Sequence, residues 1–188
     1  LRLTGKKTIY DIHEDVPRDI LTKKWIPPAL RRVISRLAEI MEDASARFMN
    51  YNIAATPHIS GRFLRQGCRA VDVNNFPILD EMSLPETPAA EKERAVCYTG
   101  GICDIRGVFQ MVEAIGKTDA VLLLAGKFVS SDEREMARNM PGWKNVRELG
   151  YITRTEVVRT LKSSMCGMVL YHPVYSVAQP NKMFEYMS

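Results

Sequence analysis

A continuous apolar run, Asp119-Ala-Val-Leu-Leu-Leu-Ala125, restricts the fold of this chain more than any other stretch. A strand exposed on one face alternates apolar and polar residues, whereas a strand covered on both faces is apolar throughout. Sheets covered on both faces are almost always parallel, because the helices of β-α-β units lie on each side. The run therefore predicts a buried strand in a parallel sheet of the α/β class.

Segments with strand and helix patterns alternate on both sides of this run. In the second half, the expected elements are a strand at 94–99, a Gly-Gly turn, a helix at 104–115 capped by Asp104, the strand at 119–125, a helix from Ser130, a strand at 146–150, a helix from Thr153 and a strand at 166–172. In the first half, they are a strand at 8–13 before a break at Pro17, a long helix from Pro28, a strand at 52–56, a helix at 57–67 and a strand at 69–75. Each half thus predicts a doubly wound parallel sheet.

An acidic segment at 80–93, which contains two prolines and no apolar periodicity, separates the halves. Such a composition is typical of a linker. The predicted organisation is a first domain at 1–80, a linker at 81–93 and a second domain at 94–188. The chain begins without Met and stops inside an expected helix, so we expect both ends to belong to a longer protein.

The net charge of +4 is mildly basic and lacks the dense positive field of a nucleic-acid-binding protein, so no nucleic-acid partner is expected. No apolar run is long enough to span a membrane. The cysteines form no Cys-x-x-Cys pair and the histidines are scattered, which predicts no metal site. The cysteines are expected to be buried free thiols in a reducing compartment, and the expected location is the cytoplasm.

The long helix from Pro28 is amphipathic. Its apolar stripe comprises Leu30, Val33, Ile34, Leu37, Ile40 and Met41. The basic residues of its first half and of the preceding segment are Lys23, Lys24, Arg31, Arg32 and Arg36, with Trp25 between them. One interpretation is peripheral contact with an anionic membrane at its inner face. The other is a domain helix with a solvated basic face, whose apolar stripe packs into the core.

The last ten residues, Gln179-Pro-Asn-Lys-Met-Phe-Glu-Tyr-Met-Ser188, are expected to begin a helix after a buried strand at 168–171. Pro180 suits the first helical position. Lys182 can reach a phosphate, and Glu185, on the same helix face as Asn181, can accept hydrogen bonds from the two vicinal hydroxyls of a ribose. The alternative is a solvated first turn with a Lys182–Glu185 pair.

The Gly100-Gly101 turn lies between another strand and helix, and Arg106 is expected in the first turn of that helix. Glycines let a ligand approach the backbone, and an Arg near a helix N-terminus favours a diphosphate. Because ligands of open parallel sheets bind at the carboxyl ends of strands, this turn and the Lys182–Glu185 segment can hold the same nucleoside diphosphate. A simple structural turn is the alternative.

Five motifs occur in a fixed order: Tyr10-Asp-Ile-His-Glu-Asp15, the Gly-Gly turn with Arg106-Gly107, Leu124-Ala-Gly126, Asn145-Val-Arg-Glu-Leu-Gly-Tyr151 and Pro180-Asn-Lys-Met-Phe-Glu-Tyr-Met187. In this order the chain resembles, over nearly its whole length, a retaining glycosyltransferase of family 4, the group 1 type. That resemblance implies a GT-B fold with two Rossmann-like, doubly wound domains, both incomplete here.

The resemblance also implies an activity. Members move a sugar, here by a hexosyltransferase type of reaction, from a nucleoside-diphosphate sugar to a glycan or lipid-linked acceptor in cell-surface polysaccharide biosynthesis. They retain the anomeric configuration and need no catalytic metal, and the donor substrate is the only small molecule expected. The C-terminal domain binds the donor, and the N-terminal domain carries most of the acceptor site.

The resemblance also assigns family roles to individual residues of this chain by their position in the motifs. Gly100 and Gly101 match the donor loop, Arg106 stands where a phosphate-binding Lys is usual, Asn181 and Lys182 match phosphate-side residues, Glu185 matches the ribose-binding Glu, and His13 matches the His that contacts the transferred sugar. The resemblance therefore predicts His13, Arg106 and Lys182 as catalytic residues.

Two positions depart from the family pattern. Val177 replaces the first Glu of the Glu-x7-Glu motif, and Gly101 replaces an Arg, so the phosphate contacts depend on Arg106 and Lys182. Two other function classes remain open. One is a different GT-B enzyme, such as a nucleotide-sugar 2-epimerase or a phosphorylase, and the other is a non-catalytic nucleotide-sugar-binding module.

Overall fold

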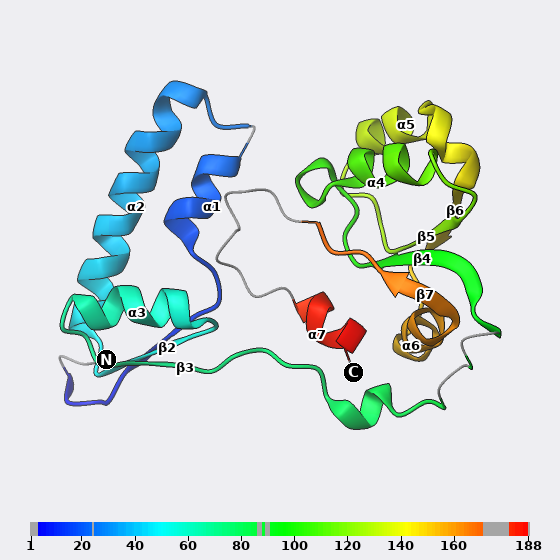
Figure 1. The fold of residues 1–188 in the computed structure, drawn as a ribbon. Coiled ribbons are helices and arrows are strands. Elements are labelled where there is room, and N and C mark those ends of the chain that lie inside the picture. Colours follow the sequence, from blue (N-terminus) through cyan, green and yellow to red (C-terminus); the bar gives the residue numbers. More distant parts are fainter. Residues whose placement is uncertain (1–3, 24, 86–87, 89–90, 171–180, 188) are drawn as a thin grey trace. The chain divides into compact units, whose positions relative to one another are not determined.

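The computed structural model describes residues 4–23, 25–85, 88, 91–170 and 181–187 (Figure 1). Contacts divide the chain into two compact units between Asn75 and Phe76, and residues 181–187 belong to the second unit. Each unit contains its own parallel sheet.

The first unit has three parallel strands in the order β1-β2-β3. Its elements are β1 (Ile9–Ile12), α1 (Val16–Thr22), α2 (Pro28–Phe48), β2 (Tyr51–Ala54), α3 (Pro57–Arg65) and β3 (Ala70–Asp72). One face of the sheet packs on α2 and α3, and the buried core residues are Ile12, Ala46, Ala54, Ile59 and Phe63. Helix α1 was not expected: Pro17 lies in the first turn of this helix instead of ending the local structure, because its fixed φ suits that turn.

A cluster of charged residues joins α2 to α3. The guanidinium of Arg62, on α3, pairs with Glu42, with Asp43 at 3.1 Å and with Asp15 at 3.4 Å. The hydroxyl of Tyr10 donates to Glu42 at 3.3 Å. The face of α2 that packs inward therefore carries carboxylates held by one buried arginine.

The apolar stripe of α2 lies on the outside of the first unit. Its six residues are exposed, with Leu37 at 56% and Met41 at 70%, whereas the buried residues of α2 are Glu42 and Ala46. The interpretation that this stripe packs into the core is therefore wrong. The ion pairs of Arg62 hold the opposite face of the helix against the rest of the unit.

The second unit has four parallel strands in the order β6-β5-β4-β7. Its elements are a 3₁₀ turn (Leu79–Met82), β4 (Glu93–Thr99), α4 (Val108–Ile115), β5 (Val121–Ala125), α5 (Ser131–Arg138), β6 (Val146–Gly150), α6 (Arg154–Ser163), β7 (Ser164–Gly167) and α7 (Asn181–Met187). Helices α4 and α5 cover one face of the sheet and α6 covers the other (Figure 1). Leu122 and Leu124 pack on the α4 side and Leu123 on the α6 side, which explains why this run is apolar throughout.

Three details of the second unit correct the sequence predictions. The last strand within the described residues is Ser164–Gly167, so the predicted strand at 166–172, with its apolar run from 168, begins too late, although the N–H of Met168 still donates to the carbonyl of Cys97 at 2.8 Å. The helix expected from Asp104 is interrupted, because Gly107 adopts a left-handed φ of 78° between a 3₁₀ turn (Asp104–Arg106) and α4. Arg106 therefore lies before α4, not in its first turn.

Other expectations concern cysteines and undescribed residues. All four cysteines are free, but only Cys97 is buried, and Cys166 is exposed. Predictions for Tyr171, His172, Val177 and Pro180 lie outside the described residues.

Candidate functional site

Three glycines at the carboxyl ends of β4, β5 and β6 bring the backbones of neighbouring loops together. The N–H of Gly100 donates to Ala125 at 2.7 Å, and the N–H of Gly126 donates to Gly150 at 2.7 Å. A Cβ on Gly126 would overlap the carbonyl oxygen of Gly100. Gly100 and Gly126 also have positive φ values of 122° and 143°. This end of the sheet therefore has a backbone surface that a ligand can approach closely.

Two cationic side chains lie beside this surface. A Cβ on Gly100 would be 2.8 Å from Cε and Nζ of Lys182 and 3.9 Å from Nη1 of Arg106, and a Cβ on Gly101 would be 4.0 Å from Nη1 of Arg106. Nζ of Lys182 lies 5.0 Å from the ring centroid of Tyr98, whose hydroxyl donates to the carbonyl of Gly101 at 2.8 Å. The structure thus brings Lys182 together with three predicted donor-site residues, Gly100, Gly101 and Arg106, from a distant segment of the sequence.

The electrostatics of this pair favour an anion. Burial, followed by repulsion from Arg106, lowers the pKa of Lys182 to about 8, and attraction to Glu185 and Cys103 opposes these effects. Two cations placed within reach of each other destabilise the doubly charged state until a negative group joins them. A perturbed lysine beside an exposed backbone is therefore a candidate phosphate-binding site.

The side chain of Tyr186 attaches α7 to the ends of β4 and β7. Its hydroxyl accepts from the N–H of Thr99 at 3.3 Å and donates to the carbonyl of Met168 at 3.5 Å. Its ring occupies the space beside Gly167, where any Cβ would overlap it. Burial raises the pKa of Tyr186 to about 12. Lys182 and Glu185 are therefore carried by a short helix that is fixed to the sheet.

The turn that carries Arg106 is also held in place. The side chain of Ser130 accepts from the N–H groups of Asp132 and Glu133, which begins α5, and Oε2 of Glu133 accepts from the N–H of Asp104 at 3.1 Å. The sequence predicted a helix from Ser130 but not the contact of Glu133 with the turn, since that contact depends on how α5 packs against the loop after β4.

Glu185 is engaged by Arg154, the first residue of α6. Nη1 of Arg154 donates to Oε1 of Glu185 at 2.5 Å, and Nε of Arg154 donates to Glu81 at 3.1 Å. Glu185 also attracts Lys182, the partner considered from spacing, and this attraction acts to raise the pKa of Lys182. The carboxylate therefore contacts Arg154 and attracts Lys182.

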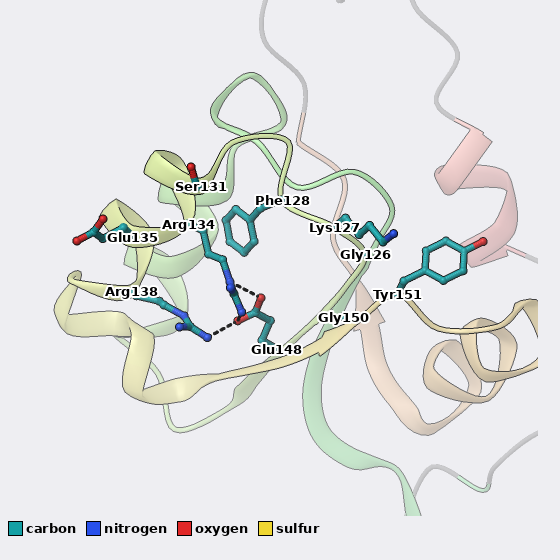
Figure 2. Close-up of a pocket in the computed structure, with 10 residues that line it drawn as sticks. All are labelled: Gly126, Lys127, Phe128, Ser131, Arg134, Glu135, Arg138, Glu148, Gly150 and Tyr151. Carbon is teal, nitrogen blue, oxygen red and sulfur yellow. Dashed lines mark hydrogen bonds and ion pairs between the residues drawn. The ribbon is translucent and has the colours of Figure 1, made fainter.

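A pocket of about 630 Å³ adjoins the glycine-lined surface at the ends of β5 and β6 (Figure 2). It is lined by Gly126, Lys127, Phe128, Ser131, Arg134, Glu135, Arg138, Glu148, Gly150 and Tyr151. Lys127 lies over the exposed ring of Tyr151 at 5.4 Å. Burial acts to raise the pKa of Glu148, but hydrogen bonds from Arg134 and Arg138 lower it. The ion pairs of Glu148 with these two arginines hold one wall of the pocket in place. Sequence reasoning missed this pocket.

The other two predicted site residues are His13 and Asn181. His13 belongs to the first unit, is exposed, and lies 3.1 Å from Oδ2 of Asp11. Asn181 is the first residue of α7, but its side chain lies outside the described part of the structure. Within the described ranges, no group of three or more His, Cys, Asp or Glu is placed to hold a metal ion, and no helix is long and apolar enough to cross a membrane.

The chain has two Rossmann-like units with parallel sheets, and its similarity to the solved structures below confirms the expected α/β fold of the GT-B class. The chain is similar to sucrose-phosphate synthase from Thermosynechococcus elongatus, with a TM-score of 0.65 and 18% identity over 99% of this chain and 50% of that one. It is also similar to HepE of Anabaena in complex with UDP-glucose, with a TM-score of 0.66 and 14% identity over 99% of this chain and 52% of that one. The chain therefore spans about half the length of these proteins. No protein-family description and no curated protein matches the sequence.

Proposed function

We propose that this chain is part of a glycosyltransferase that uses a nucleoside-diphosphate sugar as donor, and that the second unit binds the donor. The observation that carries the proposal is the convergence of Arg106 and Lys182 on the Gly100 backbone at the carboxyl end of β4. This position is where parallel α/β sheets bind nucleotides. The similarity to HepE, whose structures contain UDP, UDP with glucose, or UDP-glucose, supports the same donor class.

Each part of the donor has a matching group. Arg106 and Lys182 would bind the diphosphate, with the backbone of Gly100 and Gly101 close enough for direct contact. Glu185 would accept hydrogen bonds from the ribose hydroxyls. The base would enter the pocket beside Gly126, Gly150 and Tyr151, where an exposed aromatic ring can stack on it (Figure 2).

The chemistry that follows is electrostatic. As the bond between the sugar and the diphosphate breaks, negative charge grows on the leaving phosphate, and two fixed cations stabilise it more than they stabilise the donor. Retention of the anomeric configuration would result if the acceptor attacks the anomeric carbon from the same face as the leaving phosphate. The family resemblance assigns His13 to contact with the transferred hexose and implies a glycan or lipid-linked acceptor in polysaccharide biosynthesis. It likewise supports a family 4, metal-independent assignment.

Isothermal titration calorimetry with UDP, GDP and ADP tests the donor site. Lys182→Met and Arg106→Met should each weaken binding of the preferred nucleotide by about 10- to 100-fold, because each removes a charge-assisted hydrogen bond. Lys144→Met is the control, since Lys144 is exposed at the opposite, amino-terminal end of β6. Unchanged affinity in both site variants would refute the assignment.

Product analysis separates the function classes. Transfer to an acceptor with an unchanged anomeric configuration, seen by NMR, supports a retaining glycosyltransferase. An isomerised sugar formed from donor alone indicates an epimerase, and release of a sugar phosphate in the presence of phosphate indicates a phosphorylase. Donor binding without any of these reactions indicates a non-catalytic module.

We also propose that α2 contacts an anionic membrane. Its exposed apolar stripe, together with Trp25 at 80% exposure, would lie in the membrane interface while the neighbouring arginines bind lipid phosphates. Vesicles containing phosphatidylglycerol should retain the protein, and pure phosphatidylcholine vesicles should not. Replacing Val33 and Leu37 with Ser should reduce retention at least about tenfold.

Leu64→Ser is the matched control for the membrane experiment, because Leu64 is a similarly exposed apolar residue on α3. Equal retention by both vesicle types, or an equal loss in the control, would end the membrane proposal without affecting the donor site.

A further inference from the structure

We infer that Arg154 is a positioning residue for the ribose-binding carboxylate of Glu185, and that it fixes this carboxylate to the segment that begins the second unit. The inference rests on the proposed function, because it requires Glu185 to bind a ribose. Neither the family resemblance nor the sequence pattern points to Arg154, since its partners come from two distant segments.

All three nitrogens of the guanidinium are used. Nη1 contacts Oε1 of Glu185 at 2.5 Å, Nε contacts Oε2 of Glu81 at 3.1 Å, and Nη2 contacts Sδ of Met82 at 3.5 Å. The planar guanidinium therefore has one orientation that satisfies every partner. Its backbone is equally well defined, because Thr153 and Glu156 form a complete capping box around the start of α6.

The contact of Arg154 with one carboxylate oxygen of Glu185 leaves the other oxygen to bind the ribose. Arg154 binds Oε1 of Glu185, and a carboxylate can accept further hydrogen bonds at Oε2, where ribose hydroxyls would donate. The side chain of Glu185 is 19% exposed, so it remains accessible to a ligand. Without Arg154, Glu185 would be free to turn toward Lys182, which already attracts it, and away from the ribose hydroxyls.

A second contact ties the same two segments together. The ring of Phe76 packs edge-on against Phe184 of α7 with centroids 4.9 Å apart. Phe76 and the 3₁₀ turn Leu79–Met82 both precede β4, and Met82 is buried. Helix α7 is therefore attached to this entering segment by an aromatic pair and by the Glu81–Arg154–Glu185 chain of ion pairs.

Calorimetry with UDP and with dUDP, which lacks the 2′-hydroxyl, tests the inference. The wild-type protein should bind UDP about tenfold more tightly than dUDP, as expected for loss of one hydrogen bond to a charged acceptor. Arg154→Met should weaken UDP binding about tenfold more than it weakens dUDP binding, because dUDP can lose only the 3′-hydroxyl contact, so that the preference disappears. Glu81→Gln should reduce the preference partially. Arg159→Met, on the same helix and exposed, should change neither value.

The outcomes separate this inference from the proposed function. If Arg154→Met weakens UDP and dUDP equally, or lowers the melting temperature while the preference persists, Arg154 is only structural and the inference is overturned. If the wild-type protein binds UDP and Arg106→Met weakens it, that result leaves the proposed donor site intact. If the wild-type protein binds no UDP, or binds UDP and dUDP alike, the ribose role of Glu185 fails and the inference fails with it.

Discussion

The affinity for a nucleoside diphosphate should fall as the pH rises through the pKa of Lys182. In the free protein, burial and the charge of Arg106 lower this pKa to about 8. A bound diphosphate stabilises the charged ammonium, which returns the pKa toward its ordinary value of about 10.4. Binding is therefore coupled to proton uptake, and raising the pH removes the proton that binding needs.

The magnitude follows from these two values. Between about pH 7.5 and about pH 9.0 the protonated fraction of free Lys182 falls about eightfold, while the bound lysine stays charged, so the Kd should rise about eightfold, or about 1.2 kcal/mol. The phosphates of the nucleotide add no titration in this range, because the last phosphate pKa is about 6. At about pH 8.5, binding should take up about 0.75 proton per nucleotide.

Calorimetry in buffers of different ionisation enthalpy measures both quantities. Lys182→Arg is the matched variant, because it keeps the positive charge and cannot lose it in this range. A Kd that changes by less than about twofold in the wild-type protein would refute the reasoning, and so would an unaltered pH dependence in Lys182→Arg.

Three further perturbations test the architecture. Gly126→Ala should destabilise the second unit by about 3 kcal/mol, because its Cβ would overlap the backbone of the loop after β4. Gly150→Ala should destabilise it by only about 1 kcal/mol, because Gly150 has a positive φ but open space around its Cα. Thermal unfolding followed by circular dichroism compares the two variants. Arg62→Met should destabilise the first unit by about 3–5 kcal/mol, because Glu42 would remain buried without its partner, as hydrogen exchange of α2 would report. Thr153→Ala should cost about 1 kcal/mol in urea unfolding, because the capping box is lost. Equal effects of the two glycine variants, unchanged exchange in α2, or an unchanged urea midpoint would each contradict the corresponding reason.

The alternation of apolar runs and helical segments was enough to predict the parallel sheets. Leu122, Leu123 and Leu124 pack on opposite faces in turn, as a run without polar residues requires. The strand expected at 166–172 was misplaced, because an apolar run alone does not fix where a strand begins and ends. β7 instead comprises Ser164–Gly167, where Gly167 leaves room for the ring of Tyr186.

The candidate site was predictable only in part. Arg106 and Lys182 could be expected near the same glycines, because the carboxyl ends of parallel strands share one edge of a sheet. The partners of Glu185 could not, since Glu81 and Arg154 lie in segments that only the folded chain brings together. The exposure of the apolar stripe of α2 could not be predicted either, because periodicity identifies an apolar face but not what covers it.

The hydrogen bonds that join Gly100, Ala125, Gly126 and Gly150 have a consequence for how this chain can diversify. The contacting surface of the proposed donor site is main chain: a side chain at position 126 would overlap the backbone at Gly100, and one at position 100 would displace Lys182. Substitution at these glycines therefore cannot adjust the nucleotide preference without disturbing the site itself. Selectivity for the base must instead be altered at neighbouring exposed positions, of which Lys127 and Tyr151 are the first to randomise.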